Sequence, residues 1–171
     1  MRDLAALIRD VPDFPSPGIV FKDITPLLAD PAGLRRAVEA LASPYDGAGV
    51  THVVGMEARG FLLAAPAALA LGAGVVPVRK PGKLPRAVHE LSYDLEYGSA
   101  TLQLHQDALG PGDVVLLVDD VLATGGTAAA TRALVEQTGA TVLALAVLLE
   151  LTFLSGRTPL AGLPVTAVLT V

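Results

Sequence analysis

Residues 114–127 read VVLLVDDVLATGGT, and this stretch decides the fold. The segment Asp113–Val118 is almost continuously apolar, which is typical of a strand buried on both faces of a sheet. Two acids, Asp119 and Asp120, directly follow this predicted strand, and the turn ATGGT leads into a predicted helix over Gly126–Thr138. A buried strand, a glycine turn and a helix in this order indicate an α/β protein.

The same alternation recurs on both sides of this stretch. Further buried strands are predicted at 52–56, 75–79, 141–149 and 165–171, with helices at 4–9, 30–41 and 60–71. Alternating residues at 88–95 and 100–105 predict two more strands, in a hairpin or flap. The pattern predicts a Rossmann-like, mostly parallel β-sheet flanked by helices, in a single domain over 1–171. Ligands of such sheets bind at the carboxyl ends of the strands.

The composition excludes several classes of protein. Of the 171 residues, 52% are apolar and 17% charged, which excludes intrinsic disorder. The net charge of −5, with only 12 Lys and Arg, leaves no broad cationic surface for nucleic acid. Cysteine is absent, which excludes a thiolate nucleophile and is compatible with the reducing cytoplasm, where we expect the protein.

The sequence predicts neither a signal peptide nor a membrane-spanning helix. The charged N-terminal stretch lacks the apolar core of a signal peptide. The longest uncharged run, 61–78, contains two prolines and two glycines, so it predicts a buried helix, a turn and a short strand rather than a membrane span.

The turn ATGGT has the features of a phosphate site. Glycines permit backbone conformations closed to other residues, and free N–H groups at a helix N-terminus favour an anion. Thr124 and Thr127 can add hydroxyl donors, whereas Asp119 and Asp120 would repel a phosphate but can bind sugar hydroxyls. The turn lacks the Lys of a Walker A loop and the spacing of a dinucleotide fingerprint. These residues therefore predict a phosphorylated sugar as ligand.

VVLLVDDVLATGGT resembles the phosphoribosyl pyrophosphate signature of type I phosphoribosyltransferases. Further segments resemble the adenine phosphoribosyltransferase family in order and spacing: DFPSPGIVFKDITPLL (13–28), MEARGF (56–61), RKPGKLP (79–85), SYDLEYG (92–98) and LLELTFLSGR (148–157). The resemblance covers nearly the whole chain. It implies the type I fold, with a small hood mainly at 1–30 and a flexible β flap at about 80–105.

The resemblance also implies a reaction. Adenine and phosphoribosyl pyrophosphate would give AMP and pyrophosphate, a step of purine salvage, in a homodimer. Mg²⁺ would enter with phosphoribosyl pyrophosphate, held mainly by substrate oxygens rather than by a protein metal site. The phosphoribosyl-binding residues implied are Asp119, Asp120, Ala123, Thr124, Gly125, Gly126 and Thr127.

Further residues are implied at the reacting centre. Arg59, in the loop Glu57–Gly60, and Lys83 would contact pyrophosphate, and a strained or cis peptide is expected near Glu57–Arg59. Glu96 in the flap is implied as the group that accepts a proton, beside Tyr97.

The base would be bound by residues from two segments. Phe21 would stack on adenine while backbone groups of Val20 and Lys22 read its edge, and Leu151 would close the far side. The family often has Arg where Lys22 stands and a charge where Pro81 stands.

Three other functions compete with this reading. A phosphoribosyltransferase for hypoxanthine, guanine, xanthine or orotate would share the phosphate turn and differ around Phe21 and Leu151. A regulatory protein that senses phosphoribosyl pyrophosphate and binds nucleic acid would need a basic face. A phosphoribosyl pyrophosphate synthase would need a longer chain with an ATP site.

Overall fold

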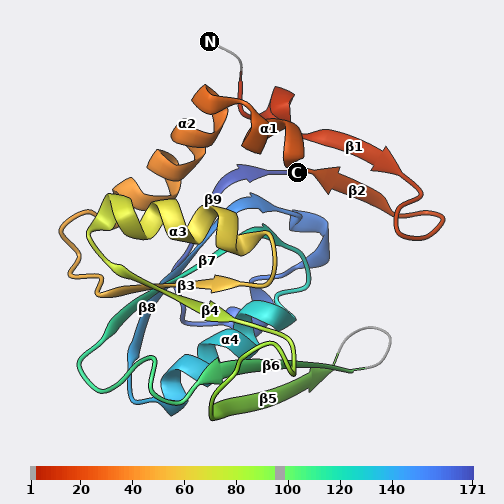
Figure 1. The fold of residues 1–171 in the computed structure, drawn as a ribbon. Helices are drawn as coiled ribbons and strands as arrows, with labels where there is room; N and C mark the ends of the chain where they lie inside the picture. The colour runs from red at the N-terminus through yellow and green to blue at the C-terminus, as the bar shows by residue number, and fades with distance from the viewer. Residues whose placement is uncertain (1–2, 95–98) are drawn as a thin grey trace.

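A computed structural model describes residues 3–94 and 99–171. Its centre is a five-stranded sheet in the order β4-β3-β7-β8-β9, with every neighbouring pair parallel. The strands are β3 (His52–Met56), β4 (Gly74–Val78), β7 (Val114–Leu122), β8 (Thr141–Glu150) and β9 (Val165–Thr170). The expected parallel sheet is thus confirmed (Figure 1).

Helices cover both faces of the sheet. Helices α2 (Pro31–Ala42) and α3 (Gly60–Leu71) lie on one side and α4 (Gly126–Gln137) on the other (Figure 1). Alternate residues of β7 supply the two cores: Leu116 and Val118 pack toward α3, and Val115 and Leu117 toward α4, all fully buried. This two-sided burial explains why the strand reads as a continuous apolar run.

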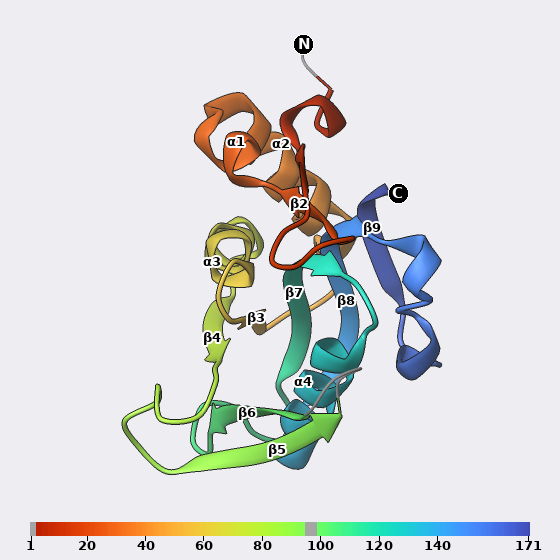
Figure 2. The same ribbon diagram turned by 90° about the vertical axis from the view of Figure 1, so that its right-hand side faces the viewer.

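Two hairpins extend from opposite ends of the sheet (Figure 2). β1 (Arg9–Pro12) pairs antiparallel with β2 (Val20–Asp23), and β5 (Val88–Asp94) with β6 (Ser99–His105). The short helix α1 (Thr25–Ala29) follows β2. Single 3₁₀ turns lie at Ala5–Leu7, Ser43–Tyr45, Thr152–Leu154 and Thr158–Leu160.

Several predicted boundaries match the structure. The strand at 52–56 and the helix at 60–71 agree residue for residue. The helix predicted from Asp30 begins at Pro31, and the Asp30 carboxylate caps it by accepting a hydrogen bond from Gly33 N at 2.7 Å.

Two expectations need correction. The strand predicted to end before Asp119 continues to Leu122, because Asp119 and Val121 still pair with Val147 and Leu149 of β8. The two acids therefore lie within a strand rather than after it. The helix predicted at 4–9 is a 3₁₀ turn at Ala5–Leu7, since Arg9 already begins β1.

Candidate active site

The carboxyl ends of β3, β7 and β8 meet the β1–β2 hairpin around a cleft of about 530 Å³. This volume lies within the usual range for a small-molecule site. The lining residues are Ile19, Val20, Phe21, Lys22, Glu57, Ala58, Arg59, Asp119, Asp120, Val121, Ala123, Thr127 and Leu151. Nine of the sequence-predicted site residues are among them, although they come from four separate segments of the chain.

The turn at 123–127 bends around a second, smaller cavity of about 70 Å³, which Thr124, Gly125 and Gly126 also line. Gly125 has φ +85°, in the left-handed region, and α4 begins at the next residue. This geometry brings the turn to the N-terminus of α4, where free N–H groups favour an anion. Thr127 Oγ1 lies 2.9 Å from the Tyr93 hydroxyl of β5, so the turn is tied to the β5–β6 hairpin.

The two acids lie side by side where β7 passes the cleft. Asp120 is 5% exposed, and Asp119 Oδ1 accepts a hydrogen bond from Asp120 N at 2.9 Å. Burial, followed by the charge of Asp120, raises the pKa of Asp119 well above its ordinary value. Gly60 makes this arrangement possible, because a β-carbon there would stand 2.7 Å from Asp119 Oδ1.

The raised pKa of Asp119 has a measurable effect on stability. A carboxyl whose pKa is raised by folding disfavours the fold at pH values above its unfolded pKa, and this cost disappears at lower pH. We expect Asp119→Asn to raise Tm at pH 7 by ~2–4 °C, for a gain of order 1 kcal/mol. Thermal melts between pH 4 and 8 should show the gain shrinking toward pH 4. The exposed Asp46→Asn serves as control; a pH-independent gain, or a loss, would contradict the interpretation.

Arg59 lines the cleft and contacts two of its other residues. Its Nε is 2.5 Å from Asp120 Oδ2, and its guanidinium carbon is 4.7 Å from the centre of the Phe21 ring. The guanidinium therefore covers one face of the Phe21 ring. The Glu57–Ala58 peptide bond is cis, which confirms the expected feature in this loop.

Glu57 connects two loops of the site, a role that was not predicted from the sequence. Its carboxylate accepts hydrogen bonds from Lys80 N at 2.9 Å and Arg79 Nε at 3.2 Å. Burial favours a higher pKa for Glu57, but the Lys80 amide and Arg79 outweigh it and hold the pKa below its ordinary value. Glu57 thereby fastens the start of the Lys80–Pro85 loop to the loop that carries Arg59. The sequence signals for this contact were an acid two residues before Arg59 and the basic residues Arg79 and Lys80 at the start of the next loop.

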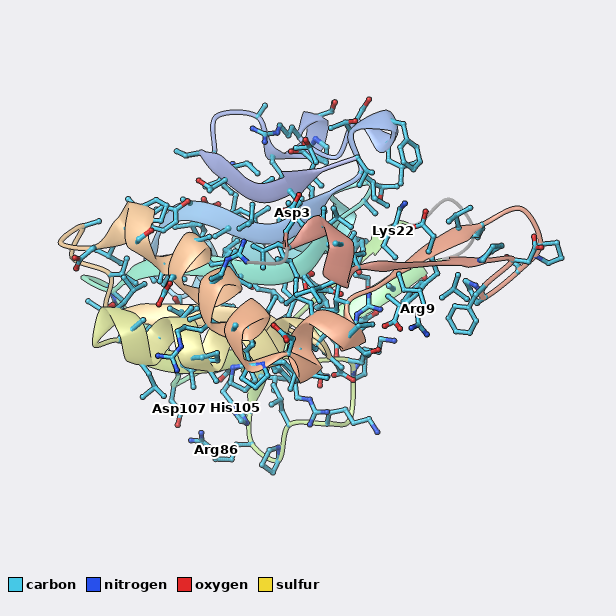
Figure 3. All side chains as sticks on the ribbon, turned by 90° about the horizontal axis from the view of Figure 1, so that it is seen from above. Asp3, Arg9, Lys22, Arg86, His105 and Asp107 are labelled. Atoms are coloured by element: carbon cyan, nitrogen blue, oxygen red, sulfur yellow. The ribbon has the colours of Figure 1, made fainter. Side chains whose placement is uncertain are left out.

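Other predicted residues are placed differently. Lys83 is exposed and does not line the cleft. The Lys22 side chain turns to Asp10, with Nζ 2.7 Å from Oδ1; Figure 3 labels this lysine. Glu96 and Tyr97 lie outside the described residues. Leu151 follows β8 and is held by its N–H, which donates to Leu122 O at 2.9 Å.

Within residues 3–94 and 99–171, no group of three or more His, Asp or Glu side chains could hold a metal ion. Of the helices in these ranges, none has the length and apolarity needed to cross a bilayer.

Comparisons with known proteins agree with this geometry. Residues 24–157 match the family model of the phosphoribosyl transferase domain. The adenine phosphoribosyltransferase of a Nocardioides species is 64% identical, over all of this chain and 95% of that protein.

Solved structures share the fold over nearly the whole chain. The adenine phosphoribosyltransferase of Rhodothermus marinus is 55% identical with a TM-score of 0.94, covering 98% of this chain and 96% of that one. The Saccharomyces cerevisiae enzyme, complexed with D-2,5-dideoxy-2,5-imino-altritol 1,6-bisphosphate and adenine, is 40% identical with a TM-score of 0.91, covering 96% and 95%.

Proposed function

Because the chain belongs to the adenine phosphoribosyltransferase family, it transfers the phosphoribosyl group of phosphoribosyl pyrophosphate to adenine, and we propose that this transfer takes place in the 530 Å³ cleft. The products are AMP and pyrophosphate, as purine salvage requires. One observation supports the site most directly: the cleft combines a helix-N-terminal turn, two adjacent carboxylates and an aromatic ring.

Each part of the substrate has a matching group. The 5-phosphate binds the N–H groups and hydroxyls of Ala123–Thr127, where the α4 N-terminus favours negative charge. Asp119 and Asp120 accept hydrogen bonds from the ribose hydroxyls. Adenine stacks on Phe21 once Arg59 has left its face, with Leu151 on the other side and the backbone of Val20 and Lys22 at its edge.

The bond from ribose to pyrophosphate breaks as a ring nitrogen of adenine bonds to the same carbon. Negative charge then grows on the leaving pyrophosphate, and Arg59 stabilises it through its planar guanidinium. Lys83 reaches the same group by movement of its loop. Glu96 accepts the proton that adenine loses, while the segment with Tyr97 excludes water.

Mg²⁺ fits this site as a partner of the substrate. It prefers oxygen ligands and keeps several waters, binding through one or two carboxylates and substrate phosphates. Asp119 and Asp120 are carboxylates of the cleft that could bind its waters. When bound, the ion neutralises charge on pyrophosphate.

The test is release of pyrophosphate that depends on adenine and Mg²⁺. We expect turnover with adenine and far slower turnover with hypoxanthine, guanine, xanthine or orotate. Asp120→Asn and Glu96→Gln should each lower kcat/KM about 10²-fold, since a ribose contact or a general base is lost. The control Asp46→Asn should keep wild-type activity. Full activity of Asp120→Asn would remove its ribose role, and full activity of Glu96→Gln would remove it from proton transfer.

Larger-scale features follow from the same assignment. We propose that residues 1–171 form one domain with a hood mainly at 1–30 and a flap at about 80–105, and that the protein is a cytoplasmic homodimer. Sedimentation equilibrium measures the dimer directly. Nucleic-acid binding without turnover would instead favour a regulatory protein.

A further inference from the structure

The segment Leu151–Arg157 follows β8, and we name it the backing turn. At its first residue, Leu151, it lines the proposed base site. At its far end, Gly156 lies against the phosphate turn at 123–127. A single short segment thus contacts both ends of the proposed substrate site.

The contact at Gly156 is between two backbones. A β-carbon at Gly156 would clash with the carbonyl oxygen of Ala123 and stand 3.0 Å from Leu122 Cγ. A β-carbon at Gly125 would in turn clash with the carbonyl oxygen of Gly156. The two turns approach so closely that neither position accepts a side chain without displacement of the other turn.

An ion pair fixes the end of the backing turn to the sheet. Arg157 donates to Glu150 through Nε at 2.8 Å and Nη2 at 2.6 Å, and its Nη1 donates to Val165 O of β9 at 3.2 Å. Glu150, the last residue of β8, is 5% exposed. Such a bidentate pair sets distance and orientation together. Neither side chain lines the cleft, so the proposed mechanism leaves both without a role.

We propose that Glu150, Gly156 and Arg157 are positioning residues: they press the backing turn against residues 123–125 and so set the shape of the phosphate-binding turn. None of the three touches the substrate. The proposal rests on the proposed function, because it assumes that the 5-phosphate binds at 123–127. It predicts that substitutions in the backing turn raise Kd for a ligand with the 5-phosphate and leave Kd for the nucleoside nearly unchanged.

The experiment compares two ligands that differ by the 5-phosphate alone. Calorimetry gives Kd for AMP and adenosine with the wild type, Gly156→Ala and Arg157→Gln. We expect Gly156→Ala to weaken AMP about 10–100-fold, since a displacement of about 1 Å in a binding turn has effects of that size. Adenosine should change less than about 3-fold, and Arg157→Gln should follow the same direction with a smaller effect.

Two further measurements separate positioning from general damage. Gly110→Ala adds a β-carbon with nothing within 4 Å, so it should change neither Kd. KM for phosphoribosyl pyrophosphate should rise in Gly156→Ala and Arg157→Gln, with kcat at saturation within about 3-fold of wild type. Arg157→Lys keeps the charge but loses the bidentate fork, so its KM for phosphoribosyl pyrophosphate should lie between those of Arg157→Gln and the wild type.

The outcomes are distinct. Equal weakening of AMP and adenosine, or no weakening, in the variants would overturn the positioning role. If Gly156→Ala does not fold, Arg157→Gln decides alone: an unchanged ratio of the two Kd values overturns the proposal. A wild-type protein that binds AMP no better than adenosine would overturn the phosphate site itself, and the positioning role with it.

Discussion

Arg59→Ala should lower kcat/KM for phosphoribosyl pyrophosphate about 10²–10³-fold, the usual loss when one group that stabilises transition-state charge is removed. The same change should strengthen binding of adenine alone, because the guanidinium that lies 4.7 Å from the Phe21 ring centre would be gone. Steady-state kinetics measures the first effect and calorimetry with adenine the second. Opposite signs for the two ligands would be difficult to produce by unfolding.

Two variants serve as controls for Arg59. Arg35 is exposed on α2 and does not line the cleft, so Arg35→Ala should leave kinetics unchanged. Arg59→Lys keeps a charge but loses the planar fork, and should recover only part of the activity. If Arg59→Ala retains wild-type kcat/KM, the residue plays no part in stabilising pyrophosphate.

Gly125→Ala should abolish most binding of phosphoribosyl pyrophosphate, with a loss in kcat/KM of at least about 10²-fold. The reason is twofold: φ of +85° is unfavourable for alanine, and the new β-carbon would clash with Gly156 O and stand 2.7 Å from Pro159 Cγ. Kinetics with varied phosphoribosyl pyrophosphate measures the loss.

Gly72→Ala isolates the backbone strain from the clash. Gly72 also has positive φ, +66°, but its β-carbon would meet nothing within 4 Å. This variant should lose stability, by about 1–2 kcal/mol for a left-handed alanine, and keep activity. If Gly125→Ala were as active as Gly72→Ala, the close packing of Gly125 against Gly156 would not be needed for activity.

Periodicity and turn chemistry predicted much of the fold. Strands buried on both faces and helices with clear starts, such as the one capped by Asp30, were found where expected. The β1–β2 hairpin was not predicted, because its strands are short, contain no buried residue and so lack a hydrophobic pattern.

The candidate site was predictable as residue types but not as contacts. The signature and Phe21 could be identified, since their chemistry is local. The pairing of Arg59 with Asp120, the anchoring of Lys80 by Glu57 and the approach of Gly156 to Ala123 each join distant segments. Such contacts depend on how the strands are ordered in the sheet, which no local pattern encodes.

The β1–β2 hairpin lies outside the parallel sheet, yet it supplies Val20, Phe21 and Lys22 to the cleft. Mutations that remodel this appendage would leave the strand order and the α4 N-terminus intact. A few substitutions in this hairpin could therefore change which nucleobase is preferred, while the residues that bind sugar and phosphate stay the same. Divergence of specificity within such enzymes should accordingly concentrate in this hairpin and around Leu151.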